Sequence, residues 1–119
     1  MEGKILKPKA FVIMPFDESF TQVFNLFIET VLKEVGYEVL RADNVRSQEN
    51  ILRNIVGNIA SADIVVADLT GSNPNVYYEL GIAHGLRRPV VLLTQNLEET
   101  PFDLRSYRMV RYSVHFAEI

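Results

Sequence analysis

The chain has no cysteine, and only two of its 119 residues are histidines. Without cysteine it can form neither a disulfide nor a thiolate metal site, which is compatible with the reducing cytoplasm where we expect it. The two histidines, His84 and His115, are not spaced as metal ligands. We therefore expect no metal ion and no bound cofactor.

An excess of basic charge is also lacking, as is any long apolar run. The formal net charge is −3, whereas a protein that neutralises nucleic-acid phosphates needs a basic surface. The apolar run at residues 10–14 is too short to span a bilayer, Pro15 ends it, and no signal-peptide cleavage pattern follows. We expect a soluble protein whose partners include neither nucleic acid nor membrane.

The chain does have enough hydrophobic residues to form the core of one domain. Hydrophobic residues make up 48% of it, including seven phenylalanines and five tyrosines, and large rings bury much apolar surface each. The length fits one domain, and no repeat, linker or low-complexity tract divides it. We treat residues 1–119 as a single domain.

Short apolar runs alternate with segments of helical period. Apolar residues recur every three or four positions over 20–35 and 51–59, which indicates two helices. A third helix is expected over residues 74–86, a segment that is apolar nearly all round. Ser19 with Gln22 matches a capping box for the first helix. The expected strands cover residues 9–14, 37–42, 63–69, 89–95 and 109–114.

Two further caps are expected, from Ser47 at the second helix and from Asn73, followed by Pro74, at the third. Strand–helix alternation of this kind implies an α/β fold with three layers, in which helices cover both faces of a five-stranded parallel sheet. We expect the flavodoxin-like (Rossmann-like) strand order 2-1-3-4-5. Ligands of such sheets bind beyond the carboxyl ends of the strands, where the strand order reverses. The segments at that edge are residues 14–19, 41–44 and 68–75.

One acidic side chain, Glu79, interrupts the apolar third helix. Four residues on lies Ala83, so no basic residue pairs with Glu79 across a turn, and Asn73 is too distant for a capping box. Glu79 is therefore either an ordinary surface glutamate or a carboxylate that points into the crevice at the sheet edge. In the crevice it can serve as a nucleophile or general base.

The other polar residues at the edge each have two interpretations. Asp68 either caps the turn after the third strand or faces a ligand beside Glu79. Asn73 and Asn75 are either turn and cap residues or amides that hold sugar hydroxyls or a base. Gly71 lies in the loop before them, and unpaired N–H groups at such a helix start can bind an anion.

The loops after the first two strands add further candidates. Phe16 is either a core residue or a ring that stacks on a base or sugar. Asp17 either precedes the first helix cap or contacts ligand. Arg41 and Asp43 are either solvated or face inward, in which case Arg41 can pair with a phosphate.

The segment ADIVVADLTGSNPNVYYELGIAHGLRRPVVLLTQ (residues 62–95), with AFVIMPF (residues 10–16), resembles the nucleoside 2-deoxyribosyltransferase-like superfamily. That group includes deoxynucleoside monophosphate N-glycosidases and is structurally close to TIR domains that cleave NAD. The match is best to small TIR-like nucleotide-binding proteins of bacteria and archaea. In the transferases the glutamate of the ELG motif attacks the anomeric carbon of the sugar. The resemblance implies that Glu79 is the nucleophile for hydrolysis or transfer across an N-glycosidic bond.

This chain departs from the family pattern at two positions. The transferases carry an aspartate six residues before the glutamate, which helps to protonate the base, and here that residue is Asn73. They also carry a tyrosine where this chain has Phe16. The resemblance thus implies a pocket with weak or altered catalysis, in which Asp68 is the remaining candidate acid. It also implies a homodimer or higher homo-oligomer, because the transferases complete their sites across oligomer contacts.

The catalytic candidates are Glu79 and Asp68, and the substrate-binding candidates are Pro15, Phe16, Asp17, Arg41, Asp43, Gly71, Asn73, Asn75 and Tyr78. The substrate is expected to be a nucleotide, a nucleoside or NAD. Two alternatives remain open: a non-catalytic nucleotide-sensing or TIR-like signalling domain, and a phosphoacceptor receiver domain with Asp68 as acceptor. A receiver needs an acidic pair after the first strand and a lysine at the end of the fifth, whereas this chain has MPFDES and VRYSV there.

Overall fold

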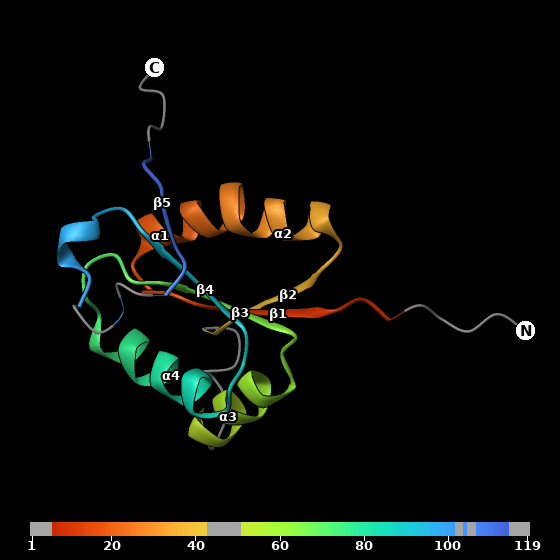
Figure 1. Cartoon of the computed structure of the whole chain (residues 1–119). Coiled ribbons are helices and arrows are strands. Elements are labelled where there is room, and N and C mark those ends of the chain that lie inside the picture. The colour runs from red at the N-terminus through yellow and green to blue at the C-terminus, as the bar shows by residue number, and fades with distance from the viewer. Residues whose placement is uncertain (1–5, 43–50, 102–103, 105–106, 115–119) are drawn as a thin grey trace, which may run out of the picture.

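The computed structural model of the chain describes residues 6–42, 51–101, 104 and 107–114. Two residues named above lie outside these ranges: Ser47, the predicted cap of the second helix, and Asp43, a candidate substrate-binding residue. The sheet has five parallel strands in the order β2-β1-β3-β4-β5 (Figure 1), which confirms the predicted fold and strand order. The strands are β1 (Lys9–Ile13), β2 (Glu38–Arg41), β3 (Ile64–Asp68), β4 (Val90–Thr94) and β5 (Met109–Arg111).

The helices lie on both faces of this sheet. One continuous rod covers one face, and two separate helices cover the other (Figure 1). The rod consists of α1 (Glu18–Val23), η1 (Phe24–Ile28) and α2 (Glu29–Val35), and the opposite face carries α3 (Ile51–Ser61) and α4 (Pro74–Gly85). A short 3-10 turn, η3 (Leu97–Glu99), follows β4.

The first helix begins two residues earlier than the sequence suggested. The carboxylate of Asp17 accepts the amide of Ser19 at 3.3 Å, and the carbonyl of Asp17 accepts the amide of Phe20 at 2.9 Å. Asp17 is therefore the N-cap, and the predicted capping box of Ser19 with Gln22 is wrong. Both residue types cap helices. Asp17 takes the position because its backbone is still extended, with φ −54° and ψ 142°.

The middle of the rod, η1, is a π-helix. The amide of Glu29 bonds to the carbonyl of Phe24, five residues back, and the hydroxyl of Thr30 reaches the carbonyl of Asn25 at 3.0 Å. Such π-turns are rare and are found often near functional sites. Here the turn lies beside the carboxyl ends of the strands, and the side chain of Phe24 contacts a buried arginine described below.

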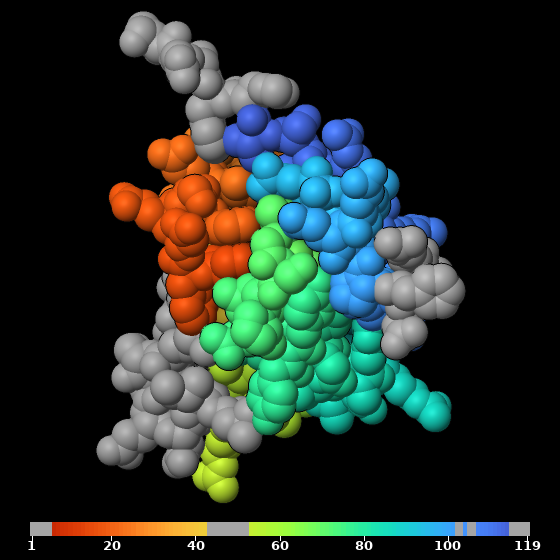
Figure 2. All heavy atoms as spheres, turned by 90° about the vertical axis from the view of Figure 1, so that its left-hand side faces the viewer, coloured from red at the N-terminus to blue at the C-terminus, as the bar shows by residue number. Residues whose placement is uncertain are grey.

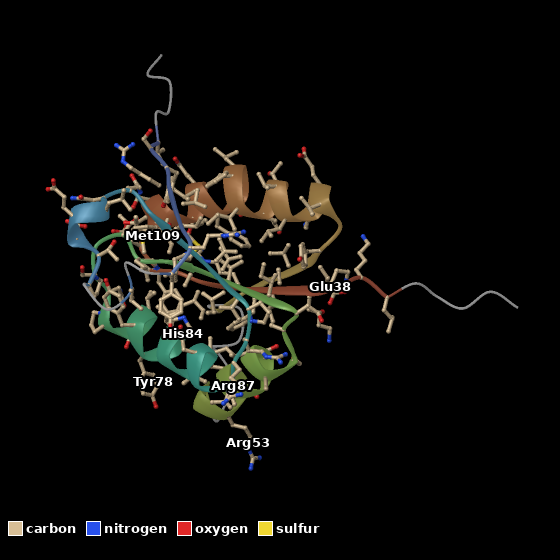
Figure 3. All side chains as sticks on the ribbon, in the orientation of Figure 1. Glu38, Arg53, Tyr78, His84, Arg87 and Met109 are labelled. Atoms are coloured by element: carbon tan, nitrogen blue, oxygen red, sulfur yellow. The ribbon has the colours of Figure 1, made fainter. Side chains whose placement is uncertain are left out.

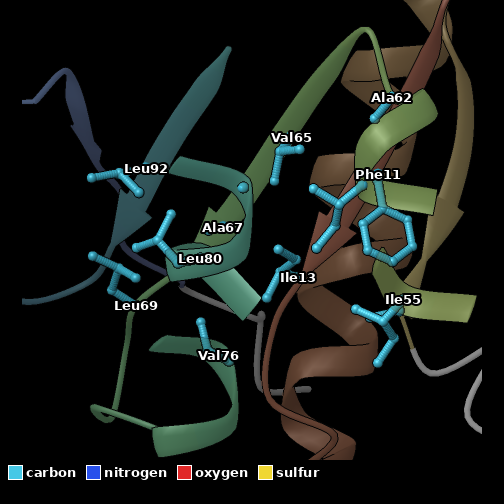
Figure 4. Packing of buried hydrophobic residues seen from close by; sticks show 13 residues of the cluster. Phe11, Ile13, Ile55, Ala62, Val65, Ala67, Leu69, Val76, Leu80 and Leu92 are labelled. Carbon is cyan, nitrogen blue, oxygen red and sulfur yellow. The ribbon is translucent and has the colours of Figure 1, made fainter. Parts of the chain in front are cut away.

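Side chains of alternate strand residues build two separate cores, one on each face of the sheet. The core under α3 and α4 contains Phe11, Ile13, Val65, Ala67, Val76, Leu80 and Leu92 (Figure 4). The core under the rod contains Val12, Met14, Val23, Phe24, Ile28, Val66 and Leu93. Residues two positions apart in a strand point to the same face of the sheet. The face to which a residue of β3 points therefore follows from the core that contains the residue two positions away.

Several apolar side chains of the rod are exposed, among them Leu26, Val31 and Val35. Within the described ranges, the helices fall short of the length and apolar character that crossing a bilayer requires.

Candidate functional site

The carboxyl ends of the strands meet at one edge of the molecule. The strand register places Ile13 beside Ala67, and Asp68 beside Leu93. Figure 2 shows this edge, with the segment after β1 in red and orange, the loop after β3 and the start of α4 in green, and the segment after β4 in light blue. Segments distant in the sequence thus meet where ligands of parallel sheets bind.

Glu79 lies on the buried stripe of α4. This stripe also contains Val76, Leu80 and Ala83, at the spacing of one helix face, and all three belong to the core between α4 and the sheet. Only 3% of Glu79 is exposed. Of the two interpretations of Glu79, the structure excludes an ordinary surface glutamate and leaves a carboxylate enclosed beneath the helix.

The loop before α4 explains how the chain brings Glu79 to that position. Asn73 is the N-cap, as predicted, and its side-chain oxygen accepts the amides of Asn75 at 2.8 Å and Val76 at 3.3 Å. Pro74 occupies the first helical position, where its missing N–H costs nothing. Gly71 (φ +82°) and Ser72 (φ +53°) have left-handed backbones, which turn the chain sharply between β3 and the helix.

Asp68 ends β3 and is 1% exposed. Its Oδ1 accepts the amide of Thr70 at 3.0 Å and the hydroxyl of Thr70 at 2.7 Å, and its Oδ2 accepts the hydroxyl of Tyr112. Burial raises the pKa of the Asp68 carboxyl above its ordinary value, and the three hydrogen bonds counteract part of that rise. Asp68 is thus a carboxylate surrounded by donors.

Tyr112 follows β5 and was not among the residues that the sequence pointed to. Its hydroxyl oxygen accepts the side-chain amide of Gln95 at 3.2 Å, and its ring packs against Phe27 with 5.5 Å between centroids. Burial, and then the bond to Asp68, raise the pKa of Tyr112 above its ordinary range. One signal could have identified it: like Asp68, it stands where a strand ends at the ligand-binding edge.

Asp68 and Glu79 are not brought together. The two neighbours of Asp68, Ala67 and Leu69, join the core beneath α4, whereas Val66, two residues before Asp68 in β3, joins the core beneath the rod. Side chains alternate along a strand, so Asp68 points toward the rod, as its bond to Tyr112 also requires. The expectation that Asp68 faces a ligand beside Glu79 does not fit this geometry.

Arg41 ends β2 and is 4% exposed. Its guanidinium donates to the carbonyl of Pro15 at 2.9 Å and to the hydroxyl of Thr21 at 3.2 Å, and lies 5.4 Å from the centre of the Phe24 ring. Pro15 is buried as well. In this structure Arg41 therefore fixes the loop after β1 to the rod.

The remaining candidates lie nearer the surface. Phe16 is 44% exposed, in the loop that Arg41 holds. Asn75 is exposed in the first turn of α4. Tyr78 is 60% exposed and projects from α4 away from the sheet (Figure 3), so it is not grouped with the others. His84, farther along α4, stacks on Tyr107 with 4.6 Å between ring centroids.

Two cavities are found near the ends of β4 and β5. One of about 360 Å³ is lined by Leu97, Glu98, Thr100 and Met109. The other, of about 240 Å³, is lined by Gln22, Val23, Leu26, Phe27, Tyr112, Ser113 and Val114. Glu79 lines neither of them. Within the described part of the chain, no three His, Cys, Asp or Glu side chains cluster as a metal site would require.

The sequence profile of the family described as nucleoside 2-deoxyribosyltransferase matches residues 16–113. No curated protein sequence gives a significant match. The profile covers Phe16, the start of α4 and Tyr112, and so includes most of the edge described above, whereas β1 and Pro15 precede it.

Solved structures of three kinds share the fold at low identity. The 2-deoxyribosyltransferase of the psychrotolerant bacterium Bacillus psychrosaccharolyticus superimposes with a TM-score of 0.73 at 19% identity, over 89% of this chain and 86% of that one. The CMP N-glycosidase of Clostridium botulinum gives 0.64 at 19% identity, over 87% and 88%. The TIR domain of a Toll-related receptor from Hydra magnipapillata gives 0.66 at 15% identity, over 87% and 82%.

Proposed function

The chain belongs to the nucleoside 2-deoxyribosyltransferase family, and on this premise we propose that it hydrolyses or transfers across an N-glycosidic bond, with Glu79 as the nucleophile. The substrate is a nucleotide, a nucleoside or NAD. The observation that carries the proposal is the place of the ELG glutamate: a carboxylate on the sheet-facing stripe of α4, one turn behind the capped start of the helix at the ligand-binding edge.

The proposed reaction has two displacements. A carboxylate oxygen of Glu79 forms a bond to C1 of the sugar while the C1–N bond breaks, and the bonding electron pair leaves with the base, which takes up a proton. Water or a second base then attacks C1 and gives up a proton to solvent, and the electron pair of the ester bond returns to Glu79. The positive charge that develops on the sugar in each transition state is stabilised by a nearby carboxylate.

Protonation of the leaving base is expected to be the slow part of this reaction. Asn73 has no titratable proton to give, and its oxygen already accepts two helix amides. Asp68 points to the other side of the sheet, with both oxygens engaged. The leaving base must then take its proton from solvent, and since general acid catalysis contributes about 10²–10⁴-fold, we expect slow turnover.

The burial of Glu79 adds a second requirement. With 3% of the residue exposed and neither large cavity touching it, a sugar reaches its carboxylate only if part of the edge moves when the nucleotide binds. The same feature favours the second candidate function, a nucleotide-sensing domain without catalysis, in which Glu79 is structural and the nucleotide binds at the edge.

A panel of nucleoside monophosphates, deoxynucleosides and NAD separates these functions. We expect slow release of free base, measured by chromatography, that Glu79→Gln abolishes without lowering the melting temperature. Glu34→Gln, which removes an exposed carboxylate on α2, is the matched control and should keep full activity. If Glu79→Gln releases base at the wild-type rate, Glu79 is not the nucleophile. If nothing is cleaved but a nucleotide raises the melting temperature, the sensing function is correct.

The receiver alternative finds no support. A phosphoacceptor aspartate must meet a phosphoryl donor and a metal ion, whereas Asp68 is enclosed by Thr70 and Tyr112. No acidic cluster that could hold a metal ion is found among the described residues.

A further inference from the structure

We propose that the hydrogen bond from Tyr112 to Asp68 fastens the loop between β3 and α4, which makes Tyr112 and Asp68 positioning residues for Glu79. The bond joins residues 44 positions apart in the sequence, one just after β5 and the other at the end of β3. The consequence for Glu79 rests on the proposed function, whereas the fastening of the loop does not.

Thr70 is the residue through which the fastening acts. Its amide and its hydroxyl both donate to Asp68, and its hydroxyl oxygen also accepts the amide of Gln95 at 3.0 Å. Gln95 in turn donates to the hydroxyl of Tyr112. The side chains of Asp68, Thr70 and Tyr112, together with the backbone amide and side chain of Gln95, thus form a closed ring of hydrogen bonds that joins the ends of β3, β4 and β5.

Only three residues separate Thr70 from the first residue of α4. The amide of Ser72 bonds back to the carbonyl of Leu69 at 3.1 Å, and Asn73 then caps the helix. A loop this short transmits a shift at Thr70 to the first turn of α4, and Glu79 lies in the next turn.

Asp68 is suited to this role by its chemistry. Three donors converge on it, and 1% of the residue is exposed, so it has neither a free oxygen nor an open side for substrate. Removing the Tyr112 hydroxyl leaves one carboxylate oxygen buried without that donor, which weakens the hold on Thr70. Tyr112→Phe does this while it keeps the ring against Phe27.

If the hydrogen bond between Tyr112 and Asp68 only held β5 in place, the expected pattern of hydrogen exchange would be different. Loss of the bond would then lower the stability of the whole protein, and every slowly exchanging amide would exchange faster in the same proportion. A positioning role predicts faster exchange confined to the loop and the first turn of α4. It also predicts a lower kcat at an unchanged KM, because the nucleophile is displaced while the binding surface is kept.

The test is amide hydrogen exchange on the free full-length protein. In Tyr112→Phe we expect the amides of Thr70, Asn75 and Val76 to exchange about tenfold faster, relative to Val12 in β1, than in the wild type. Thr70→Val should match Tyr112→Phe, and Thr70→Ser, which keeps the hydroxyl, should match the wild type. Tyr107→Phe is the control tyrosine. If these amides exchange in Tyr112→Phe as they do in the wild type, the proposal is overturned.

Base release supplies the second measurement. With a nucleotide that the wild type cleaves, Tyr112→Phe should lower kcat at least about fivefold and leave KM unchanged. Faster exchange with an unchanged kcat would show that the loop is fastened but does not position Glu79, and would overturn the proposal. If the wild type cleaves no nucleotide, the proposed function fails and with it the consequence for Glu79, while exchange at Thr70 still decides whether Tyr112 fastens the loop.

Discussion

Asp68 and Glu79 point to opposite sides of the sheet, although both lie at its carboxyl edge. Asp68 bonds to Tyr112 on the side of the rod, and Glu79 shares the buried stripe of α4 on the other side. A proton donor and a nucleophile that act on one N-glycosidic bond must both reach the same small substrate. The two carboxyl groups therefore do not form an acid–nucleophile pair, and each has to be tested by itself.

Asn73 offers the first test, because it occupies the family's aspartate position and also caps α4. Asn73→Ala removes the acceptor of two helix amides and should lower the free energy of unfolding by about 1 kcal/mol. Asn73→Asp keeps an acceptor there and should remain within about 0.5 kcal/mol of the wild type. Urea denaturation at neutral pH measures both, and a loss of less than about 0.5 kcal/mol in Asn73→Ala would show that the cap does not stabilise the helix as expected.

The same aspartate substitution has a predictable effect on base release. Two amides at a helix N-terminus favour the ionised form of a carboxyl group, so the introduced side chain carries a proton only in acid. We expect Asn73→Asp to speed base release only as the pH falls toward about 4. A gain at pH 7 equal to the gain at low pH would contradict this expectation.

Asp68 predicts a pH dependence of stability. Because burial raises the pKa of Asp68 above the 3.8 of an unperturbed aspartate, the folded protein binds this proton more tightly than the unfolded chain does. The contribution of Asp68 to the free energy of unfolding is therefore fully present below pH 3.8 and declines as the pH rises through the folded pKa. Asp68→Asn lacks this titration. The stability difference, wild type minus variant, should fall with rising pH, by at most about 1.4 kcal/mol per pH unit.

The raised pKa of Tyr112 predicts that the free energy of unfolding declines at alkaline pH. Its folded pKa lies above the 10.0 of an unperturbed tyrosine, so its contribution to stability is present below pH 10 and is lost as the unfolded side chain ionises above it. Denaturation measured between pH 9 and about 11 should show the wild type losing its advantage over Tyr112→Phe. Tyr107→Phe, at a half-exposed ring, serves as the comparison. A constant difference across this range would mean that Tyr112 ionises equally in both states.

The sequence identified the strands and helices because each has its own local pattern. Continuous apolar runs marked the two buried strands β3 and β4, and the three-to-four residue period marked the helices of the rod and α3, whereas the Asn73-Pro74 pair marked the start of α4. The cap of α1 was misplaced because Asp17 and Ser19 are both good caps, and only the backbone angle at Asp17 decides between them. The π-turn in η1 left no distinct trace, since apolar residues at Phe24, Phe27 and Ile28 fit an α-helix equally well.

The site was predicted less completely, because its contacts are long-range. Asn73 was identified as a cap from its immediate neighbours, and Glu79 from its isolation in an apolar helix. Tyr112 was missed because its partner, Asp68, lies 44 residues away and no periodicity connects them. Which side of the sheet Asp68 faces depends on the strand's exact limits, since a shift of one residue reverses every side chain.

Arg41 provides the last prediction, on how the first loop is held at the edge. Its planar guanidinium donates to two segments at once and lies against the ring of Phe24, which a lysine ammonium does not reproduce. Arg41→Met leaves the buried carbonyl of Pro15 without this donor and should lower the free energy of unfolding by about 3 kcal/mol, with Arg41→Lys intermediate.

Arg53→Met is the matched control for Arg41→Met, since Arg53 is exposed and projects from α3 (Figure 3), and it should change stability by less than about 0.5 kcal/mol. Urea denaturation compares the three variants with the wild type. Equal stabilities of Arg41→Met and Arg53→Met would mean that the buried contacts of Arg41 add nothing to the fold. Its guanidinium would then be free to turn toward a phosphate without cost, which is the role that the present geometry opposes.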